Sequence, residues 1–289
     1  MGDRALLIVN PAAGRRHAED GDLAECVKLL TAAGFDLDVR ETGTEGPTSA
    51  DLAKTGMAEG FRVVIVAGGD GTVAPAAIAL LETEVTLGIL PFGSYMNIAN
   101  GLGIPLKPIE AARVIAERKV KRSDVGEVAG KVFFETCGIG IDADMFGAAR
   151  LAERGQWRPA LRRIMRWATA NTHRVEITVD GKTERHRVLQ ILIVNSPYYG
   201  WALPIVPNAD MTDGELDVAI FPRKGRLQLL GWMARIWRTG RPGKPPRVLR
   251  GKLVEIASEE GIPVHADGQI AGRLPISARC CEGALRVFA

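Results

Sequence analysis

The sequence predicts an α/β domain with a doubly wound, mostly parallel sheet, followed by an antiparallel β domain that forms a sandwich. Up to Val120, short continuous apolar runs alternate with segments whose apolar residues recur at helical spacing, which is typical of a parallel sheet covered by helices. Beyond Val120 helical segments become scarce and short alternating runs dominate. A chain of 289 residues can hold both domains, which we expect at residues 1–124 and 125–289, with the last strands free to return to the first domain.

The first domain is expected to alternate strands and helices. The strands are short apolar runs at residues 5–9, 37–39, 62–67 and 86–90. The helices have apolar residues three and four positions apart and cover residues 23–30, 50–57, 76–81 and 109–117. A glycine-rich turn is expected between the third strand and the third helix.

The second domain is expected to consist mainly of antiparallel strands. Alternating runs lie at residues 175–179, 188–194, 216–221 and 248–256. Asp180 and Gly181 stand between two alternating runs, a pair that is typical of hairpin turns. Two helical insertions are expected at residues 150–170 and 227–238.

The composition argues against several classes of protein. None of the four cysteines stands in a C-x-x-C pair and only four histidines occur, which argues against a zinc site and a disulfide framework and fits a reducing cytosol. No run reaches about 18 apolar residues and no signal peptide is evident, so we expect a cytoplasmic protein without a membrane span. A net charge of +3 argues against a dedicated nucleic-acid binder.

The most informative motif is G-G-D-G-T at residues 68–72, between an expected strand and an expected helix. Glycines let the backbone approach a ligand and the start of a helix carries partial positive charge, so phosphate is the natural ligand. Thr72 could donate its hydroxyl to a phosphate, whereas Asp70 fits an anion site only beside a cation or a hydroxyl that needs orienting. The simpler alternative is a tight turn in which Asp70 acts as a cap. The motif is not a Walker A loop, because no Gly-Lys-Ser/Thr follows.

Two further loops are expected at the same edge of the sheet. Residues 10–14 (N-P-A-A-G) follow the first strand, and residues 91–94 (P-F-G-S) follow the fourth. The carboxyl ends of parallel strands meet at one edge, where nucleotides bind in this class of fold. The three loops together therefore predict a nucleotide site.

These motifs resemble those of the diacylglycerol kinase catalytic family, which includes bacterial lipid kinases and sphingosine kinases. The similarity runs nearly end to end and includes residues 10–14, 68–72, 91–94, 102–105, 123–126, 138–143, 195–200, 207–209, 213–218 and 267–268. The resemblance implies an ATP-binding domain with a NAD-kinase-like fold, a β-sandwich, and a lipid head group in the cleft between them. It implies transfer of the γ-phosphate of ATP to a lipid hydroxyl, diacylglycerol by default, with Mg²⁺ bridging the phosphates.

The resemblance also implies roles for particular residues. The nucleotide would be lined by Asn10, Pro11, Ala12, Ala13, Gly14, Thr42, Gly68, Gly69, Asp70, Gly71, Thr72, Val73, Gly93 and Ser94. The reaction centre would include Asp70 beside the phosphates and Asp124 at the domain junction, with Asp267 and Gln269 near the acceptor. A magnesium site would be formed by Asp210, Asp213 and the backbone carbonyl of Glu215, although the Asp213-Gly214 pair also suits a plain turn before a strand.

Four positions depart from the family's pattern. Gln269 stands where the family has a Glu that is taken as the proton acceptor, and an amide cannot accept a proton at neutral pH. Ala74 and Pro75 replace an Asn-Glu pair, with Pro75 suiting the first turn of a helix, and Met96 replaces an amide that Asn97 could supply. Because phosphoryl transfer depends mostly on positioning and charge stabilisation, we expect a slow or differently tuned kinase.

Two basic stretches suit contact with a membrane. Residues 150–174 and 223–252 combine many Arg or Lys residues with two Trp each, a pattern typical of helices at anionic interfaces. The alternative is a solvated helix whose Trp side chains pack on the β domain. We expect the lipid substrate to be met at the inner face of the membrane and no nucleic-acid partner, with a homodimer among the alternatives for assembly.

Two other functions stay open. Gln269 is compatible with a non-catalytic homologue that binds lipid or nucleotide without turnover. A soluble-metabolite kinase such as NAD kinase shares the G-G-D-G-T motif, but the N-P motif and the basic Trp-rich stretches favour a lipid kinase.

Overall fold

The computed structural model describes residues 3–12, 21–43, 45–140, 156, 158–159, 172–199, 203–204, 206–222, 235, 238–239 and 247–289. The chain divides into two compact units, of which unit 1 comprises Met1–Asp124 with Glu282–Ala289 and unit 2 comprises Val125–Cys281. The chain enters unit 2 within β5 (Val120–Val128) and returns to unit 1 within β17 (Ile276–Phe288).

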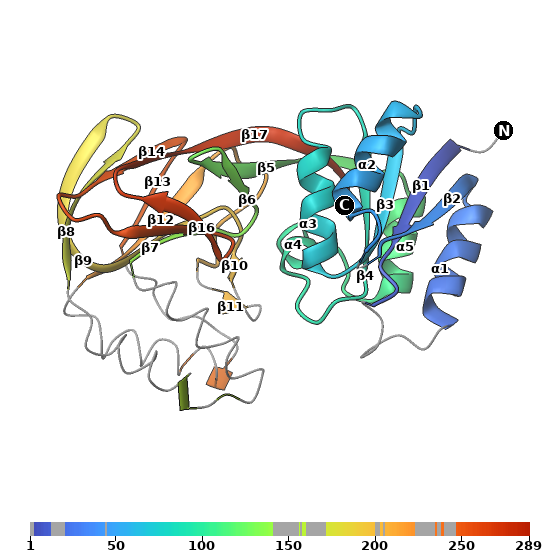
Figure 1. Cartoon of the computed structure of the whole chain (residues 1–289), viewed down its shortest axis with the longest axis horizontal. Helices are drawn as coiled ribbons and strands as arrows, with labels where there is room; N and C mark the ends of the chain where they lie inside the picture. The colour runs from blue at the N-terminus through green and yellow to red at the C-terminus, as the bar shows by residue number, and fades with distance from the viewer. Residues whose placement is uncertain are drawn as a thin grey trace. The chain divides into compact units, whose positions relative to one another are not determined.

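Unit 1 is built on parallel strands in the order β2-β1-β3-β4, with the end of β17 beside β4 (Figure 1). These strands are β1 (Asp3–Val9), β2 (Phe35–Glu41), β3 (Val63–Gly68) and β4 (Thr86–Pro91). The strands β1, β3 and β4 are buried along most of their length. Their continuous apolar runs are explained by burial on both faces.

Helices cover both faces of this sheet (Figure 1). They are α1 (Gly21–Ala32), α2 (Ser49–Ala58), α3 (Asp70–Ala79), α4 (Asn97–Gly101) and α5 (Pro108–Ala116). Helix α1 packs against α5, and α2 packs against α3. This arrangement confirms the α/β fold class with a parallel sheet that the alternating pattern predicts.

Helix α3 differs from its prediction, because it begins at Asp70 and not at residue 76. Residues 70–72 of the glycine-rich motif therefore lie in the first turn of the helix, while Gly68 ends β3 and Gly69 is the N-cap, so no separate turn stands between them. Pro75 lies inside the helix, which corrects its expected place in the first turn. Proline has no N–H, so it cannot donate to the carbonyl of Gly71 one turn earlier. The five-residue helix α4, which follows a left-handed residue at Met96 (φ 49°), was not predicted either.

Unit 2 is an antiparallel β-sandwich, as predicted. Besides parts of β5 and β17 its strands are β6 (Lys131–Phe133), β7 (Thr136–Gly140), β8 (His173–Val179), β9 (Lys182–Val194), β10 (Tyr198–Tyr199), β11 (Leu203–Pro204), β12 (Leu216–Pro222), β13 (Arg247–Gly251), β14 (Leu253–Ala257), β15 (Pro263–Ala266) and β16 (Gln269–Arg273). Its strands are hydrogen-bonded in the order β16-β15-β7-β9-β8-β14-β17, and β12 pairs with both β9 and β13. Alternate residues of β7, β8, β9, β12, β14 and β15 form one buried apolar cluster.

The run at residues 248–256 forms two strands and not one. The strands β13 and β14 meet at Lys252, where the Asp180 carboxylate accepts the N–H groups of Lys252 (3.1 Å) and Leu253 (2.9 Å). A Cβ on Gly251 would lie 2.4 Å from the Val179 side chain, so the backbone at this corner passes Val179 too closely for a larger residue. Strand β13 then pairs with β12, whereas β14 pairs with β8 and β17.

The predicted helical insertions at 150–170 and 227–238 fall almost entirely outside the described residues. Among the residues that are described, no helix has the length and apolar character needed to cross a bilayer.

Candidate functional site

The glycine-rich motif joins β3 to α3. Gly68 ends the strand, and Gly69 precedes the helix in an extended conformation (φ −92°, ψ 178°). The Gly69 carbonyl accepts the N–H groups of Thr72 (2.8 Å) and Val73 (2.9 Å). The N–H groups of residues 70 and 71 come before these donors, at the end of α3 that carries partial positive charge. The start of α3 can therefore receive an anion.

The glycines of this region serve different purposes. A Cβ on Gly68 would lie 2.8 Å from the Thr72 side chain, and a Cβ on Gly93 would lie 2.5 Å from the Cα of Gly69. Gly68, Gly69 and Gly93 therefore allow close packing between neighbouring parts of the backbone. Gly71 is exposed, and a Cβ there would meet nothing within 4 Å. Gly71 is therefore the position of the motif where a ligand can approach the backbone.

A hydrogen bond connects the loop after β1 to the start of α3. The Asn10 amide donates from Nδ2 to the Thr72 hydroxyl (2.8 Å), while its Oδ1 accepts the Ala12 N–H (2.9 Å). From the other side, the buried Ser49 hydroxyl at the start of α2 donates to the Thr72 carbonyl (2.7 Å). Ser49 was not singled out from the sequence, because a serine before a helix is an ordinary feature.

The Asp70 carboxylate is turned toward the start of α4. It accepts the N–H groups of Asn97 (3.0 Å) and Ile98 (3.2 Å), so it caps α4 from the first position of α3. Burial raises the pKa of Asp70 above its ordinary value, while these N–H groups act in the opposite direction. Asp70 is thus a cap, as the simpler alternative proposed, but of a different helix.

Asp124 lies at the last position of unit 1 in strand β5. Its side chain is buried, with 1% of the residue exposed, and its Oδ1 accepts the N–H of Gly283 on β17 at 2.6 Å. Gly283 has a positive φ of 59°, which suits glycine. Asp124 therefore holds the incoming strand against the returning one.

Asp267 and Gly268 form the turn between β15 and β16, with φ values of 43° and 75°. The Asp267 carboxylate accepts three backbone N–H groups, from Phe134 (2.7 Å), Glu135 (3.1 Å) and Thr136 (2.9 Å). Through these three hydrogen bonds Asp267 anchors the connection between β6 and β7. Gln269 begins β16 and is exposed.

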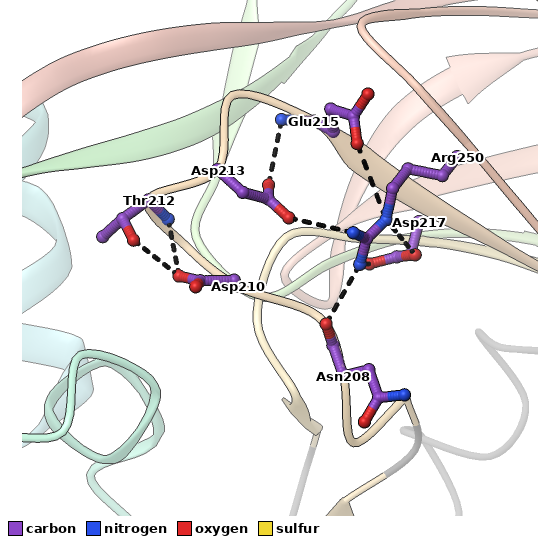
Figure 2. Close-up of polar contacts among 7 residues, drawn as sticks. All are labelled: Asn208, Asp210, Thr212, Asp213, Glu215, Asp217 and Arg250. Atoms are coloured by element: carbon purple, nitrogen blue, oxygen red, sulfur yellow. Dashed lines mark hydrogen bonds and ion pairs between the residues drawn. The ribbon is translucent and has the colours of Figure 1, made fainter.

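The acidic region expected to bind magnesium is shown in Figure 2. Asp210 Oδ1 accepts both the N–H (2.9 Å) and the hydroxyl (2.7 Å) of Thr212. Asp213 Oδ1 accepts the Glu215 N–H (3.1 Å), and its Oδ2 lies 3.3 Å from the Arg250 guanidinium. Within the described ranges, no group of three or more His, Cys, Asp or Glu side chains is placed to hold a metal. Asp210 Oδ1 and both carboxylate oxygens of Asp213 thus have protein partners, and these side chains as arranged do not fit a metal ion.

Most of the residues predicted to line a nucleotide lie at one edge of the unit 1 sheet. Asn10, Pro11 and Ala12 follow β1, Thr42 follows β2, residues 68–73 follow or end β3, and Gly93 and Ser94 follow β4. The order β2-β1-β3-β4 makes these loops neighbours. The Val73 side chain is fully buried in the core, so only its backbone is near this edge. Ala13 and Gly14 lie outside the described residues.

Two family models match the chain. One, described as "Diacylglycerol kinase catalytic domain", matches residues 4–128, and the other, "YegS C-terminal NAD kinase beta sandwich-like domain", matches residues 138–289. Together they span both units.

Individual proteins show the same similarity over more than nine-tenths of their length. A diacylglycerol kinase of Bacillus subtilis is 26% identical, over 94% of this chain and 91% of that protein. A Pseudomonas syringae protein named "Probable lipid kinase YegS-like" is 29% identical, over 98% of this chain and 92% of its own. The crystal structure of a diacylglycerol kinase from Bacillus anthracis matches with a TM-score of 0.77 at 27% identity, covering 99% of this chain and 97% of that one.

Proposed function

Since this chain belongs to the diacylglycerol kinase catalytic-domain family, to which the YegS-like lipid kinases also belong, we propose that it transfers the γ-phosphoryl group of ATP to a lipid hydroxyl. Diacylglycerol is the default acceptor, because two of the three relatives named above are diacylglycerol kinases by name. The observation that carries the proposal is the start of α3, where exposed Gly71 follows a helix N-cap at the carboxyl edge of a parallel sheet.

The phosphates of ATP would bind at the start of α3. The backbone N–H groups of residues 70 and 71 and the partial positive charge of the helix end attract an anion there. The Asn10–Thr72 hydrogen bond fixes the loop after β1 beside this helix end. Ser94 is exposed in the loop after β4, where its hydroxyl is available to the nucleotide.

Asp70 contributes by position. Its carboxylate is bound to the N–H groups of Asn97 and Ile98, so it sets the loop that carries Ser94 relative to the start of α3. Phosphoryl transfer gains most from such positioning and from charge stabilisation. We therefore assign Asp70 a positioning role.

The transfer step needs little help from a base. The lipid hydroxyl oxygen forms a bond to the γ-phosphorus, the bond from that phosphorus to the bridging oxygen breaks, and ADP leaves with the electron pair. The hydroxyl proton passes to water. In a loose transition state this proton leaves late, so an amide at Gln269 can orient the hydroxyl without accepting the proton. A base would contribute about 10²–10⁴-fold, which fits a slow enzyme in its absence.

Magnesium would enter with ATP. Mg²⁺ is commonly held by substrate phosphates with few protein ligands, and there it neutralises phosphate charge.

We propose peripheral contact with the inner face of the membrane through the basic stretches at 150–174 and 223–252, which fall largely outside the described residues.

A protein that binds lipid or nucleotide without turnover is the second candidate function, and the exposed amide at Gln269 favours it.

A panel of acceptors tests the proposal. The purified chain is incubated with γ-labelled ATP, MgCl₂ and mixed micelles that contain diacylglycerol, sphingosine or ceramide, and in a parallel reaction with NAD without micelles. We expect label in a lipid, with ADP formed in equal amount. Label in NAD alone would show a metabolite kinase. Bound ATP without label in any acceptor would favour the binding protein.

A further inference from the structure

Arg250 stands among three carboxylates in unit 2 (Figure 2). Its guanidinium binds Asp217 with two nitrogens, Nε to Oδ1 at 3.0 Å and Nη2 to Oδ2 at 3.1 Å. Asp213 lies 3.3 Å from Nη1, and Glu215 lies 3.7 Å from Nε. The Asn208 carbonyl also accepts from Nη2 at 3.0 Å. One side chain thus connects β13 to both ends of residues 208–217.

The strand register explains the pair with Asp217. Strands β12 and β13 are antiparallel, and Asp217 stands directly opposite Arg250. Asp217 is only 5% exposed, so its charge needs a partner in place of water. A guanidinium meets a carboxylate with two parallel hydrogen bonds, which fixes direction as well as charge. The hydrogen bond to Asp217 raises the pKa of Arg250, so the cation persists at any pH that the fold tolerates.

A divalent ion would need a different arrangement of the same oxygens. Mg²⁺ requires several oxygens that converge on one point at octahedral angles. Here both oxygens of Asp213 have partners, and Asp210 Oδ1 accepts two donors from Thr212. The carboxylates of Asp213, Glu215 and Asp217 point at the planar guanidinium of Arg250, which also donates to the Asn208 carbonyl (Figure 2).

We propose that Arg250 is the internal cation of this acidic segment, so that residues 208–217 keep their structure without a bound divalent metal. The guanidinium provides positive charge where the resemblance implied magnesium. The folded chain should accordingly show no dependence on Mg²⁺ in the absence of nucleotide.

Thermal unfolding of the full chain without nucleotide tests this proposal. Wild-type protein should keep the same Tm in EDTA and in rising MgCl₂ or MnCl₂. Arg250→Gln should lower the Tm by about 5–10 °C, because it leaves the buried Asp217 charge unpaired. Arg247→Gln is the matched control, since Arg247 lies on the same strand and pairs with the single carboxylate of Glu184. That control should shift the Tm by about 2 °C or less.

Arg250→Lys provides a second variant if Arg250→Gln does not fold. It keeps the charge but loses the paired geometry, so its Tm should fall between those of wild type and Arg250→Gln. A wild-type Tm that drops in EDTA, or rises saturably with Mg²⁺, would overturn the proposal. Stoichiometric Mn²⁺ binding seen by electron paramagnetic resonance in wild type and lost in Asp213→Asn would also overturn it, as would equal Tm losses in Arg250→Gln and Arg247→Gln.

Discussion

Three aspartates of this kinase-family chain, Asp70, Asp124 and Asp267, direct their carboxylates at backbone N–H groups. Each bond joins segments that are distant in the sequence, by 27, 159 and 133 residues for the first contact of each. The motifs around these residues therefore stabilise the fold, in addition to any part that they play in the reaction. The free energy of unfolding of a variant at these positions must be measured before a change in its activity is interpreted.

Asp70 should make the stability of the fold depend on pH. Its pKa is raised by burial, so the folded chain holds a proton at pH values where the unfolded chain has lost it. The contribution of Asp70 to stability is thus fully present below the ordinary Asp pKa and decreases as pH rises through the raised value. Asp70→Asn removes this titration. In urea unfolding from pH 3.5 to 8, we expect wild type to lose stability relative to Asp70→Asn as pH rises, and a constant difference would contradict the assignment.

Gly71→Ala should separate structure from binding. Alanine meets no atom within 4 Å and is the better helix former, so the free energy of unfolding should rise by up to about 1 kcal/mol. If phosphates lie against this backbone, the added methyl group should weaken ATP binding about tenfold. Calorimetric titration with ATP, beside urea unfolding, gives both values. A more stable variant with unchanged ATP affinity would place the phosphates elsewhere.

Gln269→Glu should show whether position 269 lies near the hydroxyl group of the lipid acceptor. The residue is exposed, so the substitution should leave the Tm nearly unchanged. A carboxylate near the lipid hydroxyl would add base catalysis and raise the transfer rate up to about 10²-fold. The added rate should disappear below a pH of about 4.3, where Glu is protonated. A folded variant without any gain at pH 7 would show that this position does not reach the acceptor.

At the scale of elements, the turn between β15 and β16 anchors the connection between β6 and β7. Asp267 has a φ of 43°, which Asn tolerates and Ala does not, so Asp267→Asn is the informative variant. It keeps one acceptor oxygen but loses the charge and the second oxygen, and we expect a loss of about 1–3 kcal/mol in urea unfolding. Asp36→Asn, at an exposed position of β2, is the control and should change stability by less than about 0.5 kcal/mol. Equal losses in the two variants would contradict the anchoring role.

The sequence predicted the kinds of element better than their limits. The strands β1, β3 and β4 were found because buried parallel strands form continuous apolar runs. The start of α3 was missed because Gly68, Gly69 and Gly71 stand close together there, and clustered glycines usually indicate a turn. The break between β13 and β14 was missed because residues 248–256 were taken as one run, and the corner at Lys252 depends on the Asp180 carboxylate, which is distant in the sequence.

At the scale of the whole molecule, the alternating pattern predicted which loops share an edge of the unit 1 sheet. Asn10 and Thr72 could be expected near each other for that reason, although their hydrogen bond could not. The contacts of Arg250 were not predictable, because they depend on the register between β12 and β13, and the pattern did not give the limits of β13. The pairing of the end of β17 with β4 joins segments about 200 residues apart, which no local pattern can specify.

The central claim is that ATP gives its γ-phosphoryl group to a lipid from the start of α3. The most direct test is the rate of label transfer from γ-labelled ATP to diacylglycerol in mixed micelles for wild type, Gly71→Leu and Ile78→Leu. Leu at position 71 extends into open space over the proposed phosphate site, while the exposed Ile78 of the same helix is far along α3 and serves as the control. We expect Gly71→Leu to lose at least about 10²-fold in rate with its fold intact, and Ile78→Leu to match wild type. Equal rates in all three proteins would contradict the claim.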